Sequence, residues 1–110
     1  MVNEKIAPVE LLVEDVNSGT ITVPVPTSSS SYYSTNVNVS KDGYTPIGVV
    51  GWRIGNADSG GANWSYTTLL RSYLGTSSGN PVVFVAFHNY ASSDAVIKIQ
   101  LWVLYQKNKG

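Results

Sequence analysis

The side chains that perform acid–base chemistry are few in this chain and are scattered along it. Its 110 residues include seven carboxylates and one histidine. Four of the carboxylates precede residue 16, and the other three, Asp42, Asp58 and Asp94, lie in predicted turns, where aspartate commonly hydrogen-bonds its own backbone. General acid–base catalysis needs two titratable groups positioned in one cleft. The distribution therefore predicts that the protein is not an enzyme.

His88 is the only histidine, and it ends an apolar run beside Asn89. A serine hydrolase would bring a serine and an acid to this histidine, but no serine stands in a Gly-x-Ser-x-Gly turn. A zinc site normally needs several His or Cys ligands, and the chain has no cysteine. We therefore expect no metal and no cofactor, and we predict that His88 is packed or hydrogen-bonded at the end of a strand.

Gly48, Gly51 and Gly55 lie within a strongly strand-like stretch, GYTPIGVVGWRIGN, at residues 43–56. Their spacing is G-x-x-G-x-x-x-G rather than the phosphate-binding G-x-G-x-x-G, and no helix follows that could direct its N-terminus at a phosphate. Glycine weakens an ordinary strand, so its repeated use needs a geometric reason. We predict that this strand is covered by protein on both faces or contains β-bulges. Gly48→Val or Gly51→Val should then impair folding or assembly.

The elements that position these residues are predicted to be β-strands. Short apolar or alternating runs separated by turn-forming clusters are typical of an antiparallel sandwich or barrel. We expect an all-β chain, built as an antiparallel sandwich or barrel, with about six to eight strands. Strands are predicted at residues 9–15, 20–25, 37–40, 43–56, 64–74, 81–89 and 95–107. A helix is conceivable over 64–74, but the threonine and aromatic residues there favour a strand.

The chain divides into two parts of different composition. Residues 27–36, TSSSSYYSTN, form a polar run without aliphatic residues, which predicts a flexible loop. We assign residues 1–36 to an N-terminal arm, or shoulder strands, that ends in this Ser/Tyr-rich loop. Residues 37–110 are assigned to the β-sandwich head.

The last predicted strand, at residues 95–107, has two different faces. One face is predicted to be core and carries Ile97, Ile99, Leu101, Val103 and Tyr105. The opposite face mixes polar residues with Trp102 and Leu104, which suits packing against a second sheet or a neighbouring subunit.

The surface composition favours association through uncharged groups. Only 13% of the residues are charged, and the formal net charge is zero. A low-charge surface tends to associate with itself or with a partner, whereas capture of nucleic acid or of an anionic membrane needs a basic excess. The N-terminus has no signal-peptide pattern, and no apolar stretch approaches transmembrane length, so we expect no membrane insertion.

Aromatic residues near the predicted loops make recognition more credible than catalysis. Flat aromatic rings stack on the apolar faces of sugars, while Asn and Asp side chains bond to hydroxyl groups. The alternative is that these rings fill the ends of the core or a subunit interface. The residues that we single out for ligand binding are Tyr32, Tyr33, Asp58, Asn63, Trp64 and Tyr66.

Two stretches, GYTPIGVVGWRI and NPVVFVAFHNYASSDAVIKIQLWVLYQK, resemble the C-terminal modules of tailed-phage and prophage tail-fibre or receptor-binding proteins. The resemblance covers roughly residues 43–107 and lies in strands and turns, so it carries over no receptor-binding residue. It implies an antiparallel, jelly-roll-like β-sandwich head in an intertwined homotrimer, located in the virion tail and assembled in the bacterial host cytoplasm. The implied role is attachment of the virion to a host surface glycan or protein, alongside other tail proteins.

Two other functions are compatible with the same residues. A monomeric carbohydrate-binding module attached to a bacterial enzyme would use the same aromatic side chains. A purely structural tail or baseplate protein would bind no receptor. The oligomeric state distinguishes the carbohydrate-binding module, a monomer, from a trimeric attachment protein. Glycan binding distinguishes the attachment protein from a structural tail protein, which should bind no glycan.

Overall fold

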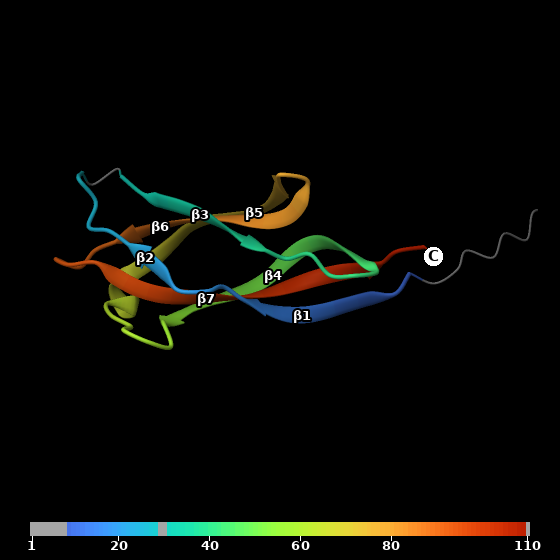
Figure 1. Ribbon diagram of the computed structural model, residues 1–110, viewed down its shortest axis with the longest axis horizontal. Coiled ribbons are helices and arrows are strands. Elements are labelled where there is room, and N and C mark those ends of the chain that lie inside the picture. Colours follow the sequence, from blue (N-terminus) through green and yellow to red (C-terminus); the bar gives the residue numbers. More distant parts are fainter. Residues whose placement is uncertain (1–8, 29–30, 110) are drawn as a thin grey trace, which may run out of the picture.

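The computed structural model describes residues 9–28 and 31–109, which form seven β-strands (Figure 1). The strands are β1 (Leu11–Asn17), β2 (Ile21–Val23), β3 (Tyr33–Asn38), β4 (Tyr44–Asn56), β5 (Thr67–Ser77), β6 (Asn80–Asn89) and β7 (Ala95–Lys107). One short 3-10 turn, η1 (Trp64–Tyr66), precedes β5. The prediction of an all-β chain with about six to eight strands is confirmed.

The strands form two antiparallel sheets that are stacked on each other (Figure 1). In sheet A, the long strand β7 lies between β4 on one side and both β1 and β2 on the other. In sheet B, β6 lies between β3 and β5. The predicted antiparallel sandwich is therefore confirmed.

The hydrophobic core lies between the two sheets and follows from alternation along β6 and β7. The predicted core face of β7 is buried at every position: Ile97, Ile99, Leu101, Val103 and Tyr105. Val83, Val85 and Phe87 of β6 belong to the same cluster and are fully buried. Each large apolar side chain removed from water contributes about 1.5–3 kcal/mol. The alternating pattern of these two strands therefore specifies most of the core.

The N-terminal segment is part of the sandwich. β1 pairs with the second half of β7, and β2 pairs with its first half. The boundary predicted at residue 36 falls within β3, and residues 1–8 of the predicted arm lie outside the described residues. In the part of the chain that is described, β1, β2 and the start of β3 are integral to the two sheets.

Of the polar run at residues 27–36, residues 27–28 and 31–32 lie outside the strands, and residues 29–30 are not among the described residues. The loop prediction is wrong for residues 33–36, which form the start of β3. Pairing with β6 supplies their backbone hydrogen bonds and buries Val37 to 5% exposure. These tertiary contacts outweigh the low strand propensity of serine and asparagine at an edge position.

The boundaries of β5 also differ from the prediction. Trp64–Tyr66 forms the 3-10 turn instead of the start of a strand, and β5 continues to Ser77. The β5–β6 hairpin then closes through Ser78 and Gly79, whose φ angles are 50° and 80°. Two successive positive φ angles are those of a type I′ turn, which matches the twist of paired strands.

The glycine-rich strand β4 contains two β-bulges. Its pairing with β7 shifts register between Pro46 and Gly48 and again between Val49 and Gly51. The bulge alternative is thus confirmed. A Cβ atom at Gly51 would lie 3.4 Å from the Trp102 ring, whereas a Cβ atom at Gly48 would meet nothing within 4 Å. Within a single chain, Gly48 therefore leaves open space on the outer face of sheet A.

Tyr105 closes one end of the core and makes the stability of the fold sensitive to alkaline pH. Its hydroxyl donates a hydrogen bond to the Val39 carbonyl oxygen at 2.8 Å. Burial raises the pKa of Tyr105 above its ordinary value of 10.0, and the nearby charge of Glu14 raises this pKa further. The folded state therefore holds this proton more tightly than the unfolded state does. The contribution of this proton to the free energy of unfolding is fully present below the ordinary tyrosine pKa. It is lost as the pH rises through the raised pKa of folded Tyr105.

Tyr105→Phe is expected to lower the free energy of unfolding by about 1 kcal/mol at neutral pH, because the buried Val39 carbonyl loses its donor. The difference between the two proteins should narrow above about pH 10, where unfolded tyrosine ionises. Urea denaturation of the wild type and of Tyr105→Phe at neutral and alkaline pH measures this difference in the free energy of unfolding. A difference that stays constant or widens with pH would contradict the assigned pKa shift.

Candidate binding surface at one end of the sandwich

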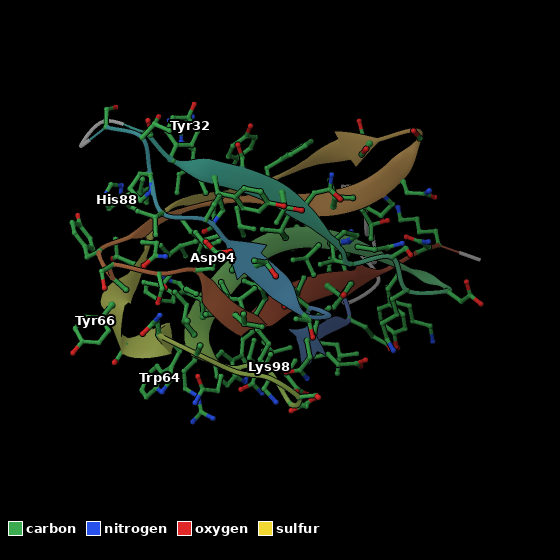
Figure 2. All side chains as sticks on the ribbon, turned by 60° about the vertical axis from the view of Figure 1, so that its left-hand side comes forward. Tyr32, Trp64, Tyr66, His88, Asp94 and Lys98 are labelled. Atoms are coloured by element: carbon green, nitrogen blue, oxygen red, sulfur yellow. The ribbon has the colours of Figure 1, made fainter. Side chains whose placement is uncertain are left out.

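Three chain connections meet at the end of the sandwich where β6 ends and β7 begins. Val23 at the end of β2 pairs with Ala95, the first residue of β7, and Thr67 at the start of β5 pairs with Asn89, the last residue of β6. We call this region the loop end; it comprises residues 24–28, 31–32, 57–66 and 90–94. Figure 2 shows the side chains as sticks and labels Tyr32, Trp64, Tyr66 and His88 among the residues at or next to this end.

The loop end carries large aromatic side chains that are exposed to solvent. They come from the three connections and the first residue of β3: Tyr32, Tyr33, Trp64, Tyr66 and Tyr90. The Tyr90 N–H donates a hydrogen bond to the Tyr66 carbonyl oxygen at 2.8 Å, which joins two of the connections. The predicted site residues Tyr32, Tyr33, Trp64 and Tyr66 therefore all lie at the loop end, but Trp64 and Tyr66 lie on η1, well apart from Tyr32 (Figure 2). Tyr90 was not among the predicted set, although its place directly after a predicted strand marks it as a loop residue.

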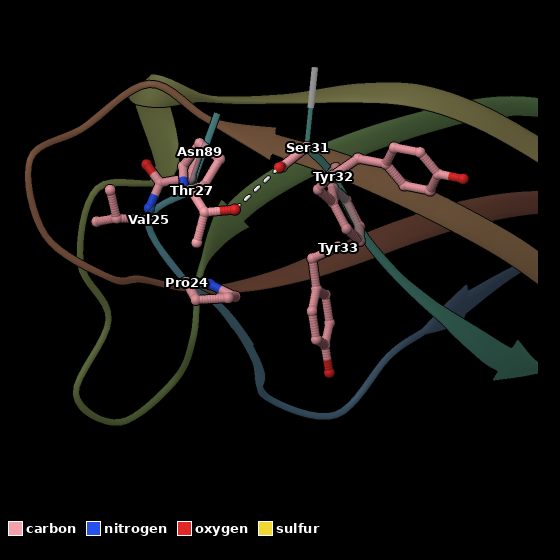
Figure 3. A pocket seen from close by; sticks show the side chains of 9 residues that line it. Pro24, Val25, Thr27, Ser31, Tyr32, Tyr33 and Asn89 are labelled. Atoms are coloured by element: carbon pink, nitrogen blue, oxygen red, sulfur yellow. Dashed lines mark hydrogen bonds between the residues drawn. The ribbon is translucent and has the colours of Figure 1, made fainter. Parts of the chain in front are cut away.

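A depression of about 270 Å³ opens at the loop end beside β3 (Figure 3). Its apolar wall is formed by Pro24, Val25, Pro26 and the rings of Tyr32, Tyr33 and Phe87. Thr27 and Ser31 add hydroxyl groups, whose oxygen atoms lie 3.2 Å apart. Aromatic and apolar surface beside a few hydroxyl groups is the lining typical of a small-molecule site.

Asn89 holds the loop end in place from inside. It is 1% exposed, and its Nδ2 donates to the carbonyl oxygen of Val23 at 3.1 Å and to that of Ser93 at 2.9 Å. Its Oδ1 accepts from the Ala91 N–H at 2.8 Å. One buried side chain thus connects the end of β2 with both sides of the β6–β7 connection. Such satisfied buried networks rigidify the segments that they join.

Asn63 has a comparable role in the neighbouring connection. Its backbone is left-handed, with φ of 55°, and its Nδ2 donates to the Ser93 Oγ and to the Asp94 carbonyl oxygen, each at 3.0 Å. Asn63 was predicted as a ligand-binding residue, but the structure engages its amide group within the protein. Its contribution is to position η1, on which the exposed Trp64 and Tyr66 lie.

Asp58 lies apart from the depression. Its Oδ1 is 2.6 Å from the Nζ of Lys98, and Lys98 projects from the outer face of β7 in sheet A. The Asp58 side chain is 87% exposed, and ion pairs in such positions contribute little to stability. Of the predicted site residues, the structure therefore places Tyr32 and Tyr33 in the depression, and Asp58, Trp64 and Tyr66 outside it.

His88 is packed at the edge of the loop end, as predicted. It is 7% exposed, its Nδ1 lies 2.8 Å from the Ser31 carbonyl oxygen, and its ring centroid is 4.3 Å from that of Tyr90. Because a carbonyl oxygen only accepts, this geometry indicates that Nδ1 carries a proton. His88 thereby anchors the segment that leads into Tyr32.

The described residues include no group of three or more His, Cys, Asp and Glu side chains that could hold a metal ion. Within the same ranges, no helix is long and apolar enough to cross a membrane.

Comparison with protein families, with curated proteins and with solved structures found no match for this chain. The class of protein is therefore defined by the fold and the surface alone. It is an antiparallel β-sandwich with an aromatic surface at one end.

Proposed function

We propose that this chain is a non-enzymatic recognition module of a phage tail fibre, which attaches the virion to a glycan on the host cell surface. The observation that carries the proposal is the group of exposed aromatic rings at the loop end, supported from within by Asn89 and Asn63. The sequence resemblance supplies the tail-fibre context, including the virion tail as location and other tail proteins as neighbours.

Sugar recognition follows from the kind of surface that the loop end offers. Aromatic rings pack against the apolar faces of sugar rings, and hydroxyl groups such as those of Thr27 and Ser31 bond to sugar hydroxyls. A preformed site also binds more tightly than a mobile one, because less conformational entropy is lost on binding. The hydrogen bonds of the buried Asn89 and of the partly exposed Asn63 support that preorganisation.

The proposal includes a homotrimer that is assembled through the outer face of sheet A. This face carries large apolar side chains that are between 46% and 60% exposed: Leu11, Val13, Ile47 and Val50. They surround Leu104 and Trp102 on β7, and Gly48 leaves open space beside them. A contiguous apolar area of this kind is typical of an interaction site.

The charges at the margins of this face favour a second copy of the chain as its occupant. Asp15 lies on the β1 side, in register with Trp102, and Arg53 lies on the β4 side, in register with Gln100. When three copies turn this face toward a common axis, the β1 edge of each copy meets the β4 edge of the next. Asp15 of one copy then approaches Arg53 of its neighbour. Trimerisation would also present three loop ends, so that weak individual contacts add up through avidity.

A glycan array tests the recognition function, with the double variant Trp64→Ala/Tyr66→Ala as the critical protein. Both side chains are exposed on η1, so their removal should leave the fold intact. We expect roughly thirtyfold weaker glycan binding, because each of the two stacked rings contributes about 1 kcal/mol.

Trp52→Ala is the matched control, since Trp52 is equally exposed but lies on β4 away from the loop end. Unchanged binding by the double variant would contradict the assignment of the loop end. An intact wild-type protein that binds neither glycans nor host cells would instead favour a purely structural tail role. A monomer that binds glycans would favour the carbohydrate-binding module of an enzyme.

A further inference from the structure

A second depression, of about 190 Å³, lies on the outer face of sheet B next to the loop end. We call it the Arg71 groove; its lining includes Tyr32, Ser34, Arg71, Tyr73, Phe84 and Ala86. Tyr32 also lines the depression of the loop end and therefore separates two adjoining hollows. One oligosaccharide chain can thus lie across both.

The strand register explains why a hollow forms here. Ser34 of β3, Ala86 of β6 and Arg71 of β5 lie in one row across sheet B, and the next row holds Asn36, Phe84 and Tyr73. Ala86 lies in the middle of its row and has a small side chain. The surface of sheet B is therefore hollowed at this position, between the larger side chains around it. The side chains around Ala86 cover it almost completely, since it is 1% exposed.

One wall of the groove is a stacked aromatic pair. The ring centroids of Tyr73 and Phe84 are 5.2 Å apart, with 28° between their planes. The Phe84 ring lies against Gly75, where a Cβ atom would come within 2.6 Å of it. Because Gly75 has no side chain, Phe84 lies close to the sheet, and Tyr73 packs on Phe84 with 52% of its own surface exposed.

The opposite wall presents a positive charge. The guanidinium carbon of Arg71 lies 5.2 Å from the centroid of the Tyr32 ring, in a cation–π arrangement. The ion pairs among the described residues involve Lys41, Lys98 and Lys107, and none of them involves Arg71. Arg71 is therefore a preoriented cation without a compensating carboxylate in the described part of the chain.

We propose that the Arg71 groove is a subsite for an acidic sugar, in which Arg71 binds the carboxylate. The planar guanidinium forms two parallel hydrogen bonds to a carboxylate. The Tyr73 ring then packs against the apolar face of the sugar, and the Ser34 hydroxyl bonds to a sugar hydroxyl. This inference rests on the proposed glycan recognition and narrows its ligand to chains that contain uronic or similar acidic sugars.

The test is an NMR titration of the full chain with methyl glucuronide and, separately, with methyl glucoside. We expect the glucuronide to bind at least about tenfold more tightly, because only it offers a carboxylate to Arg71. Its shift changes should centre on Ser34, Arg71 and Tyr73. Arg71→Ala should remove the preference for the glucuronide over the glucoside. Arg71→Lys should recover only part of this preference, since lysine keeps the charge but cannot form the two parallel hydrogen bonds. Lys109→Ala, which removes an exposed cation beyond the end of β7, is the control and should keep the preference for the glucuronide.

Three outcomes would overturn the inference: equal binding of the two sugars, a preference that survives in Arg71→Ala, or competition by inorganic sulfate as strong as that by the glucuronide. The last outcome would indicate a general anion site.

If neutral glycans bind and their binding depends on Trp64 and Tyr66, while Arg71 variants have no effect, only this inference fails. If the glucuronide preference depends on Arg71 while Trp64 and Tyr66 do not matter, the loop-end proposal fails and the acidic subsite stands.

Discussion

Asn89→Ala is expected to lower the free energy of unfolding by about 2 to 4 kcal/mol, because one buried and two partly buried hydrogen bonds to the backbone are lost at once. The carbonyl oxygens of Val23 and Ser93 lose a donor, and the Ala91 N–H loses an acceptor. Each unsatisfied buried group costs about 1–3 kcal/mol. For a domain whose net stability is about 5–15 kcal/mol, this is a large fraction.

The same change should weaken glycan binding at the loop end in molecules that remain folded. Asn89 joins the end of β2 to the β6–β7 connection, so its loss loosens the segments that carry the aromatic rings. Urea denaturation measures the stability, and hydrogen exchange of residues 90–94 measures the local loosening.

Two further variants make the Asn89 prediction specific. Asn89→Asp keeps an acceptor for the Ala91 N–H but places a carboxylate against two carbonyl oxygens, so it should be destabilised as well. Asn80→Ala removes an exposed asparagine at the β5–β6 hairpin and should change stability by less than about 0.5 kcal/mol. Equal stability of Asn89→Ala and Asn80→Ala would contradict the role assigned to Asn89.

Val50→Asp is expected to convert the proposed trimer into monomers, with at least about a hundredfold weaker association. Val50 is 60% exposed in the single chain, so the substitution costs the monomer little. In the trimer, three carboxylates would be removed from water near one axis without counter-charges, which costs several kcal/mol. Light scattering and sedimentation at several concentrations measure the change.

Leu70→Asp is the matched control for Val50→Asp. Leu70 is 49% exposed and lies at the bulge of β5, an edge strand of sheet B, so the variant should still form trimers. Gly48→Val supplies an independent test, because a Cβ atom at this position meets nothing within 4 Å in a single chain. It should leave monomer stability nearly unchanged and weaken association. A wild-type protein that is monomeric at all concentrations would contradict the trimer, and a trimeric Val50→Asp would contradict the assigned face.

Much of the fold follows from local patterns. The alternation along β7 identified its core face, because side chains in a strand point to opposite sides in turn. The turn-forming clusters correctly divided most of the chain, and the prediction failed where pairing outweighed composition, as in residues 33–36 of β3. Those residues have little strand propensity of their own, and only β6 beside them makes them a strand.

The candidate site was predictable in its residue types but not in its geometry. Aromatic side chains next to loops marked Tyr32, Tyr33, Trp64 and Tyr66 correctly as surface residues. Nothing in the local sequence distinguished Asn63 and Asp58 from ligand-binding residues. In the structure, the Asn63 amide supports a loop, and Asp58 pairs with Lys98 on sheet A. The relation of Arg71 to Ser34 and Tyr32 was equally hidden, because these residues are brought together only by the register of sheet B.

By itself, the sequence determined that this protein is an antiparallel β-structure with a low-charge surface, exposed aromatic rings near its turns and no concentrated acid–base chemistry. These are properties of composition and of neighbouring residues. Only the tertiary structure decided which connections share one end, where Gly48 leaves open space, and that an arginine without a described carboxylate partner borders an aromatic groove. The physical reason is that strand order and register depend on pairing between residues far apart in the chain, and a change of one residue in register moves every side chain to the other face.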